Sequence, residues 1–140
     1  MKYFWVLLTV LITVQAALIQ LTDDNFSDLV TKEDEWIVDF YADWCSYCKK
    51  AAPRIEAAER LLRLSSHKHV KVGLVNVETS PALAARFLIS RLPTVVHIKD
   101  HQVRRVPSIR HENDIISFVT LEEWKQVEPS SGFIQPFSLL

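Results

Sequence analysis

The chain has 140 residues, of which 49% are hydrophobic and 24% charged, and a formal net charge of −1. This length and composition predict one domain of ordinary size and exclude disordered and collagen-like classes. The near-zero charge argues against a dedicated nucleic-acid-binding protein. The two cysteines can form one disulfide at most and cannot supply a four-thiolate zinc site. The question of function therefore narrows to that pair.

The first segment is predicted to be a targeting signal rather than a part of the folded domain. Lys2 precedes an apolar run at 3–14, which is shorter than the roughly 20 residues that span a bilayer. Val14-Gln15-Ala16 then supplies small residues, so 1–16 is predicted to be a secretory signal peptide, with an uncleaved anchor as the alternative. The predicted location is the lumen of the endoplasmic reticulum, or its luminal membrane side, with secretion as the alternative. Asn25-Phe26-Ser27 is a candidate N-glycosylation site in that compartment.

Strand and helix patterns alternate along the rest of the chain. The expected elements are a strand at 17–21, a helix carrying Phe26, Leu29 and Val30 and capped by Thr22, Asp23 or Asp24, a buried strand at 36–41, a helix from Cys45 to about Leu64, a strand at 70–77, a helix from Ser80-Pro81 to Leu88, strands at 94–98 and 103–106, and a helix at about 112–127. The order β-α-β-α-β-α-β-β-α predicts an α/β fold, with a mixed central sheet of about five strands and helices on both faces. One domain fills 17–128, and 129–140 is a tail or the stump before a membrane anchor.

Three details of these helices and strands can be checked. Pro53 lies inside the long helix and should kink it, because proline lacks the N–H and clashes with the preceding turn. The short polar turn at 99–102 predicts an antiparallel hairpin between its two flanking strands. The last helix should present Ile115, Phe118, Val119 and Trp124 on one broad face.

Cys45 and Cys48 stand at the start of a helix that follows a buried strand. This spacing brings the two sulfurs within disulfide reach, and the helix N-terminus favours the thiolate form of Cys45. A thiolate is the attacking species in disulfide exchange, so Cys45 suits the attacking role. Cys48, one turn into the helix and expected to be more buried, suits the resolving role. The alternatives are a structural disulfide and a zinc site completed by His67 and His69, which are better interpreted as surface histidines.

Asp39 and Pro93 are the other two anomalies. Asp39 interrupts an apolar strand, and a buried carboxylate without a partner should have a raised pKa. It either faces water from an edge strand or lies under the cysteine helix as a proton carrier for Cys48. Pro93 in Leu92-Pro93-Thr94 opens a strand, where proline is tolerated. The sequence leaves open whether the Leu92–Pro93 peptide is cis.

These residues together resemble a known family. The segment from Val38 to Lys49, with Trp44-Cys45-Ser46-Tyr47-Cys48 at its centre, resembles the active-site segment of thioredoxins, and Leu92-Pro93-Thr94 is similar to their cis-proline loop. The resemblance covers roughly 18–127 and extends to domains of protein disulfide isomerases. Closer similarity to the thioredoxin-related transmembrane proteins of the endoplasmic reticulum is carried by Arg86-Phe87, Lys99-Asp100, Arg104-Arg105, Glu123-Trp124-Lys125 and Glu128-Pro129.

The resemblance implies a role for each of the site residues. Cys45 would be the nucleophile, Cys48 the resolving thiol and Asp39 the buried acid. Pro93 would be cis, leaving the Leu92 backbone free to pair with an extended client segment. The implied client-binding residues are Trp44, Leu92 and Pro93, and the implied tuning residues are Ser46, Tyr47, Lys49 and Arg110. Arg110 aligns with an arginine that assists the resolving cysteine in disulfide isomerase domains, or is a solvated surface residue.

The chain departs from the family at several positions. Ser46-Tyr47 replaces the Gly-Pro of thioredoxin and the Gly-His of disulfide isomerases, and the missing histidine suggests a less oxidising site than that of disulfide isomerase. His101 and Ser108 occupy places where relatives carry glycine, so His101 would need a positive φ.

The predicted function is a thiol–disulfide oxidoreductase of the reductase or isomerase type. Its predicted partners are cysteine-containing client proteins of the secretory pathway and an unknown regenerating partner, with no nucleic acid, and with a membrane only if a longer form carries an anchor. The redox-active Cys45–Cys48 disulfide is expected to need no cofactor and no metal. The alternative is a chaperone-like client-binding module with little turnover, followed by a secreted domain with a structural disulfide. The direction of electron flow, the reduction potential and the oligomeric state stay open.

Overall fold

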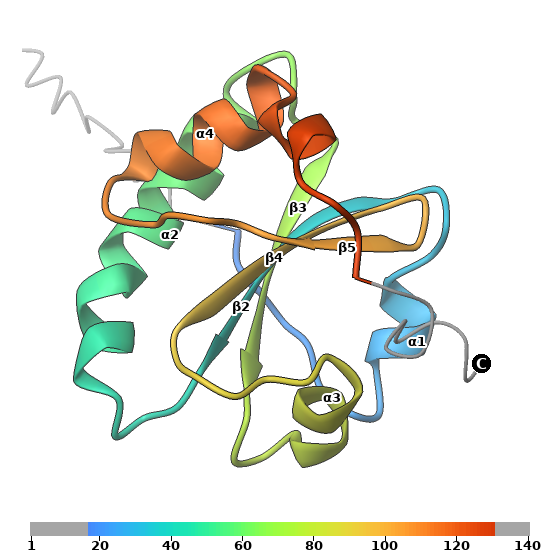
Figure 1. Ribbon diagram of the computed structural model, residues 1–140, viewed down its shortest axis with the longest axis vertical. Helices are drawn as coiled ribbons and strands as arrows, with labels where there is room; N and C mark the ends of the chain where they lie inside the picture. Colours follow the sequence, from blue (N-terminus) through green and yellow to red (C-terminus); the bar gives the residue numbers. More distant parts are fainter. Residues whose placement is uncertain (1–16, 131–140) are drawn as a thin grey trace, which may run out of the picture.

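The computed structural model describes residues 17–130 (Figure 1), so the predicted signal segment at 1–16 and most of the predicted tail lie outside the described residues. The elements follow the predicted order and end with one additional short 3-10 helix. They are β1 (Ile19–Gln20), α1 (Phe26–Leu29), β2 (Glu35–Tyr41), α2 (Ser46–Arg63), β3 (Val70–Asn76), α3 (Pro81–Arg86), β4 (Thr94–Lys99), β5 (Gln102–Arg105), α4 (Glu112–Thr120) and the 3-10 helix η1 (Glu123–Gln126).

The five strands form one mixed sheet in the order β1-β3-β2-β4-β5. β3 runs parallel to both β1 and β2, whereas β4 runs antiparallel to β2 and β5 antiparallel to β4. β2 is therefore the central strand, and Asp39 is paired with Leu74 on one side and with Val95 on the other. The alternative of an edge strand with Asp39 facing water is wrong.

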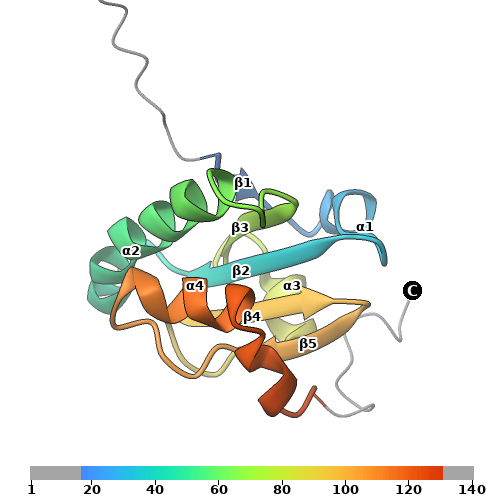
Figure 2. The ribbon, with the colours of Figure 1, turned by 90° about the horizontal axis from the view of Figure 1, so that it is seen from above.

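Helices cover both faces of this sheet, as predicted (Figures 1 and 2). One core lies under α1 and α3 and includes Trp36, Val38 and Phe40 of β2. The second lies under α2 and α4 and includes Ile37 of β2. Because side chains alternate along a strand, Asp39 faces the same way as Ile37, towards the α2 side. The strand thus places a carboxyl group beneath the helix that begins next to the cysteines.

The first helix begins later than the capping pattern suggests. Asn25 is its N-cap residue, and none of Thr22, Asp23 or Asp24 takes that position. The Thr22 N–H donates to Asn25 Oδ1 at 2.8 Å, and the Asn25 N–H donates to Thr22 Oγ1 at 3.2 Å, so Thr22 closes the preceding turn instead. Leu29, expected on the apolar face, is 39% exposed in this single short turn of helix.

The last helix ends at Thr120 rather than near residue 127. Glu122 adopts a left-handed φ of 54°, which stops the helix and starts η1. The reversal brings the Trp124 ring 5.4 Å from the ring of His97, centroid to centroid. Trp124 therefore packs on β4 from a separate turn, and does not lie on the face of the helix.

Three local predictions concern Pro53, His101 and Ser108. α2 is 18 residues long and continues past Pro53, and the kink at this residue stays a prediction. In the β4–β5 hairpin, Asp100 and His101 have φ values of 52° and 59°, the positive-φ pair of a two-residue hairpin turn, so the expected positive φ at His101 is confirmed. Ser108 instead acts through its side chain, whose hydroxyl donates to Asp114 Oδ2 at 2.7 Å near the start of α4. Among residues 17–130, no helix is long and apolar enough to cross a membrane.

Candidate active site

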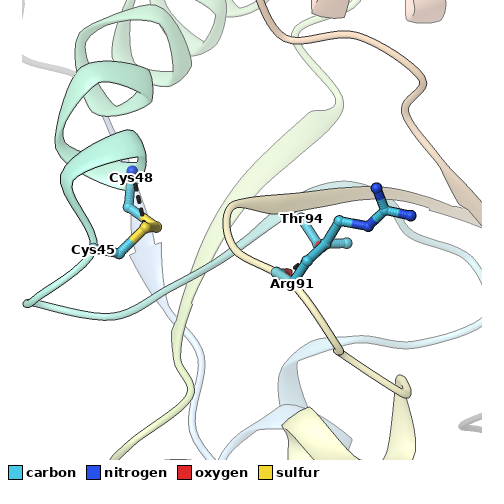
Figure 3. Close-up of a disulfide and its surroundings, with 4 residues drawn as sticks. All are labelled: Cys45, Cys48, Arg91 and Thr94. Carbon is cyan, nitrogen blue, oxygen red and sulfur yellow. Dashed lines mark hydrogen bonds between the residues drawn. A yellow bond between two sulfur atoms is a disulfide. The ribbon is translucent and has the colours of Figure 1, made fainter.

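Cys45 is the N-cap residue of α2, and it is joined by a disulfide to Cys48 in the first turn. The two Cα atoms lie 5.2 Å apart. The Cys48 backbone N–H donates to Cys45 Sγ over 3.1 Å, one of the N–H groups that a helix start leaves without a backbone partner (Figure 3). The helix dipole and this N–H both favour negative charge on Cys45 once the disulfide is opened.

Exposure does not separate the roles of the two cysteines. Cys45 is 5% exposed and Cys48 is 4% exposed, so the expected greater burial of Cys48 amounts to almost nothing in the disulfide form. Their neighbours Trp44 and Tyr47 are 71% and 70% exposed, which is unusual for large aromatic side chains. The position of Cys45 at the helix cap is therefore what distinguishes it chemically.

The loop before β4 lies opposite the disulfide (Figure 3). The Leu92–Pro93 peptide bond is cis, and the Leu92 side chain packs against the small cluster formed by Ala42, Cys45 and Cys48. Thr94 is buried, and its hydroxyl donates to the Arg91 carbonyl at 2.7 Å. The site is thus assembled from two segments that are far apart in the sequence.

Asp39 lies below the start of α2 and is 3% exposed. Within residues 17–130, its Oδ1 atom has no hydrogen-bond partner among protein atoms. Burial raises the pKa of Asp39 to about 7, because the charged form loses its hydration without gaining a partner. Asp39 and Cys48 line the same cavity, together with Lys49 and Glu56. The carboxyl group can therefore exchange a proton near neutral pH within reach of the cavity that Cys48 lines.

The remaining predicted residues fall into two groups. Arg110 lines a second pocket with Tyr47 and Pro93, so the structure brings it to the rim of the site on the side away from Asp39. Asn25 does not join the site, and its side-chain amide donates to the Gln20 carbonyl at 3.0 Å. Glycosylation of Asn25 stays a prediction.

The histidines considered as zinc ligands lie near the other end of α2. His69 Nε2 is 3.1 Å from Glu35 Oε2, and the His67 ring is 6.0 Å from the His69 ring. Across the described part of the chain, no group of three His, Cys, Asp or Glu side chains could hold a metal ion.

Part of the rim around the disulfide was not predicted from the sequence. Lys50 and Arg54 line the second pocket beside Tyr47, and Ile109 lines it from the segment before α4. The helical spacing of Tyr47, Lys50 and Arg54 places them on one face of α2, and that periodicity was a usable signal. Nothing comparable in the sequence marked Ile109.

The arrangement defines the class of the protein: a mixed α/β domain with a two-cysteine disulfide at a helix N-terminus, opposite a cis-proline loop. The family model for thioredoxin matches residues 17–121, and the chain belongs to the thioredoxin family. The fold is the thioredoxin fold, in agreement with the resemblance of the sequence to thioredoxins.

Several relatives place the chain within this family. It is 38% identical over 120 residues to thioredoxin-related transmembrane protein 1 of Bos taurus, covering 86% of this chain and 41% of that one. It is 33% identical over 106 residues to protein disulfide-isomerase A5 of Mus musculus, covering 76% and 19%. The solution structure of the first thioredoxin domain of mouse protein disulfide-isomerase A4 matches with a TM-score of 0.69 at 27% identity, covering 81% and 83%. The chain spans less than half the length of these two curated relatives.

Proposed function

We propose that the chain is a thiol–disulfide oxidoreductase that exchanges disulfides with client proteins of the secretory pathway. The observation that carries the proposal is the Cys45–Cys48 disulfide at the N-cap of α2, facing the Leu92–Pro93 cis peptide. The apolar segment at 3–14 and the likeness to a thioredoxin-related transmembrane protein support an endoplasmic reticulum location, in the lumen or on the luminal side of the membrane. The proposed domain covers 17–128.

In the reducing direction, the Cys45 thiolate attacks one sulfur of a client disulfide. A bond forms between Cys45 Sγ and that sulfur, and the bond between the two client sulfurs breaks. The second client sulfur leaves as a thiolate. The backbone N–H of Cys48 and the N-terminus of α2 stabilise the attacking thiolate.

In the second step, the Cys48 thiolate attacks Cys45 Sγ and expels the client sulfur. The Cys45–Cys48 disulfide forms, and two electrons have passed from the pair to the client. Asp39 accepts the proton of the Cys48 thiol, since its raised pKa of about 7 lets it bind and release a proton near neutrality. In the oxidising direction the same steps run backwards, and Asp39 returns the proton to Cys48.

Client binding uses the surface around the pair. Extended client backbone pairs with Leu92, in the strand-addition mode, and the exposed Trp44 ring supplies apolar contact. The two residues between the cysteines are Ser46 and Tyr47, and neither is a histidine. The thiolate of Cys45 therefore has no imidazolium at these positions to stabilise it. The proposed reduction potential is therefore below the value of about −180 mV that is typical of protein disulfide isomerase, which favours the reductase direction.

The test is a trapping experiment with a disulfide-bonded protein substrate. The reduced wild-type chain should reduce it, and Cys45→Ser should abolish the reaction. Cys48→Ser should accumulate a mixed disulfide through Cys45, detectable as an adduct by mass spectrometry. Ser66→Ala is the matched control, because it changes an exposed residue in the turn beyond the far end of α2, and it should leave the reaction unchanged.

The outcome that overturns the proposal is equally concrete. If Cys45→Ser reduced the substrate as fast as wild type, the mechanism would be wrong. If the double variant Cys45→Ser/Cys48→Ser bound clients as tightly as wild type while the wild type showed no turnover, the chain would be a client-binding module instead.

A further inference from the structure

The charge around the disulfide is divided between two sides. Two adjoining pockets share Pro93 and Ile109, on the side of α2 that faces β4 and β5. Their lining includes five cationic side chains, Lys50, Arg54 and Arg110 in one pocket and Arg91 and Arg105 in the other. Neither pocket has a carboxylate in its lining. We call these two adjoining pockets the cationic groove.

The other side of the disulfide carries more carboxyl groups than cations. The cavity that contains Cys48 is lined by three carboxyl groups, those of Asp39, Asp43 and Glu56, against the single cation Lys49. It also borders Leu18 and Leu74, on the β1 and β3 side of the central strand. A client that approaches the disulfide therefore meets an excess of positive charge on one side only.

The cations of the groove have no carboxylate partner in the described part of the chain. Arg54 donates to the Ile109 carbonyl at 3.2 Å, and Arg105 donates to the Leu88 carbonyl at 3.0 Å. The Lys50 ammonium lies 5.7 Å from the centre of the Tyr47 ring. These contacts hold the side chains in place but leave their charge uncompensated.

Some cations elsewhere on this domain do have a carboxylate partner. Arg63 pairs with Glu59 at 3.0 Å, and Lys71 pairs with Asp34 at 2.9 Å. Both pairs lie away from the disulfide, beyond the first turns of α2. Five cations that lack a carboxylate partner among residues 17–130 thus line the groove beside the cis-proline, next to the backbone that the proposed client segment would pair with.

We propose that the cationic groove selects client segments that carry Asp or Glu side chains near the reacting cysteine. This inference rests on the proposed function and names the substrate class of that same site. A segment paired with the Leu92 backbone runs beside Pro93 and Ile109, which border both pockets, so its side chains pass close to the five cations. In Figure 3 the Arg91 guanidinium points away from the disulfide, so Arg91 meets client residues farther from the cysteine than Arg110 does.

The expected preference is moderate and depends on salt. Exposed ion pairs are individually weak, but several of them on one face raise the association rate of an oppositely charged partner. Salt at about 0.5 M shortens the Debye length to less than half its value at about 0.05 M and screens these charges. We expect a Glu-flanked client peptide to react about three- to tenfold faster than its Gln-flanked counterpart at low salt, with most of this ratio lost at high salt.

The experiment uses three synthetic peptides with one cysteine each, activated as the same mixed disulfide and flanked by Glu, Gln or Lys. Rates of reduction by the full chain are measured by stopped flow, and each rate is divided by that of the Gln peptide. Arg110→Gln should lower the Glu-to-Gln ratio about two- to threefold. Lys68→Gln is the matched control, because it removes the same charge from an exposed turn at the far end of α2, and it should leave the ratio unchanged.

The ratio separates substrate selection from a general effect on the cysteines. If Arg110 acted only by assisting Cys48, Arg110→Gln would slow all three peptides equally and the inference would be overturned. Equal rates for the Glu and Lys peptides with wild type would also overturn it, while leaving the proposed function intact. If no peptide reacted at all, the proposed function itself would fail.

Discussion

Two carboxyl groups on the central strand β2 share a burial environment but not a chemical state. Glu35 stands at the start of the strand and Asp39 four positions later, and both face the α2 side of the sheet. They are 6% and 3% exposed, respectively. Burial alone would raise the pKa of both groups.

The hydrogen-bond partners of the two carboxyl groups explain why their pKa values differ. Burial acts to raise the pKa of Glu35, but hydrogen bonds from His97 at 2.8 Å and Lys99 at 3.2 Å outweigh it and lower this pKa to about 2. Asp39 has no such donor among residues 17–130, and burial raises its pKa to about 7. The end of β2 that is remote from the cysteines is neutralised by ion pairs, whereas the end beside them keeps a carboxyl group that titrates near neutral pH.

The two groups therefore bias stability in opposite directions. The pKa of Glu35 is depressed from 4.5, so its contribution is present above that value and is lost as pH falls towards 2. The pKa of Asp39 is raised from 3.8, so the folded state binds the extra proton and loses stability as pH rises from there to about 7. Stability governed by these two groups should be greatest where the two ranges overlap, near pH 4.

Removing the unpaired carboxyl should have the largest effect. Asp39→Asn should raise the free energy of unfolding at about pH 8 by on the order of 4 kcal/mol, because each unit of raised pKa corresponds to about 1.36 kcal/mol. The gain should nearly vanish at about pH 3, where Asp39 is largely protonated in both the folded and the unfolded state. The measurement is urea unfolding of the disulfide form at both pH values. The same variant should slow disulfide exchange by about tenfold or more, because it removes the proton carrier. Equal stability of variant and wild type at the higher pH would show that Asp39 is solvated or paired.

Removing the paired carboxyl should have the opposite sign. Glu35→Gln should lower the free energy of unfolding by about 3 kcal/mol near pH 7, because it leaves the buried His97 and the nearby Lys99 without their anion. Urea titrations at neutral and acidic pH test this, since the loss should shrink as Glu35 itself becomes protonated. A neutral effect at pH 7 would mean that the ion pairs only balance the cost of burying Glu35. The exchange rate should not change, which separates this end of the strand from the active site.

A smaller change should move Glu35 towards the behaviour of Asp39. Lys99→Met removes one of its donors, a side chain that is 36% exposed. The pKa of Glu35 should rise towards its ordinary value, and the free energy of unfolding at pH 7 should fall by about 1 kcal/mol or less. The acid unfolding transition should shift to higher pH, because the pKa of Glu35 is higher in the variant. An unshifted acid transition would assign the stabilisation of Glu35 to its two histidine partners, His97 and His69.

The smallest effect on the pH dependence of stability is expected for a substitution of Ile37, which lies between the two carboxyl groups on β2. Ile37 lies on the same face of β2 and is fully buried in the core under α2 and α4. Ile37→Val should reduce the free energy of unfolding by about 1 kcal/mol by removing one methylene group, with the same value at every pH. Unfolding curves between about pH 4 and 8 provide this baseline. A loss that varied with pH would mean that packing at Ile37 is coupled to one of the carboxyl groups.

The two ends of β2 also differ in how far the sequence predicted them. Asp39 was identifiable because a single charge interrupts an apolar strand, and its neighbours Cys45 and Cys48 come directly after in the chain. Glu35 follows Glu33 and Asp34, so its sequence context resembles a solvated loop. Its partner His97 is 62 residues away, and no local pattern connects the two.

The left-handed residues His101 and Glu122 also differ in how far the sequence predicted them. The positive φ of His101 was predictable from the length of the hairpin and the glycine of its relatives. The left-handed Glu122 was not, because the apolar spacing of 112–127 continues smoothly through it. The left-handed residue goes together with the packing of Trp124 on His97, a tertiary contact that no local pattern shows. The cationic groove was likewise hidden, since its five cations come from α2, the cis-proline loop, β5 and the segment before α4.

The most direct test of this account is a carboxyl-carbon NMR titration of Asp39 and Glu35 in the disulfide form. The expected midpoint is near pH 7 for Asp39 and near pH 2 for Glu35. The Asp39 midpoint should be absent in Asp39→Asn, which assigns the signal. A midpoint for Asp39 near its ordinary value of 3.8 would contradict the account, because a carboxyl that stays ionised at neutral pH cannot carry the proton of Cys48.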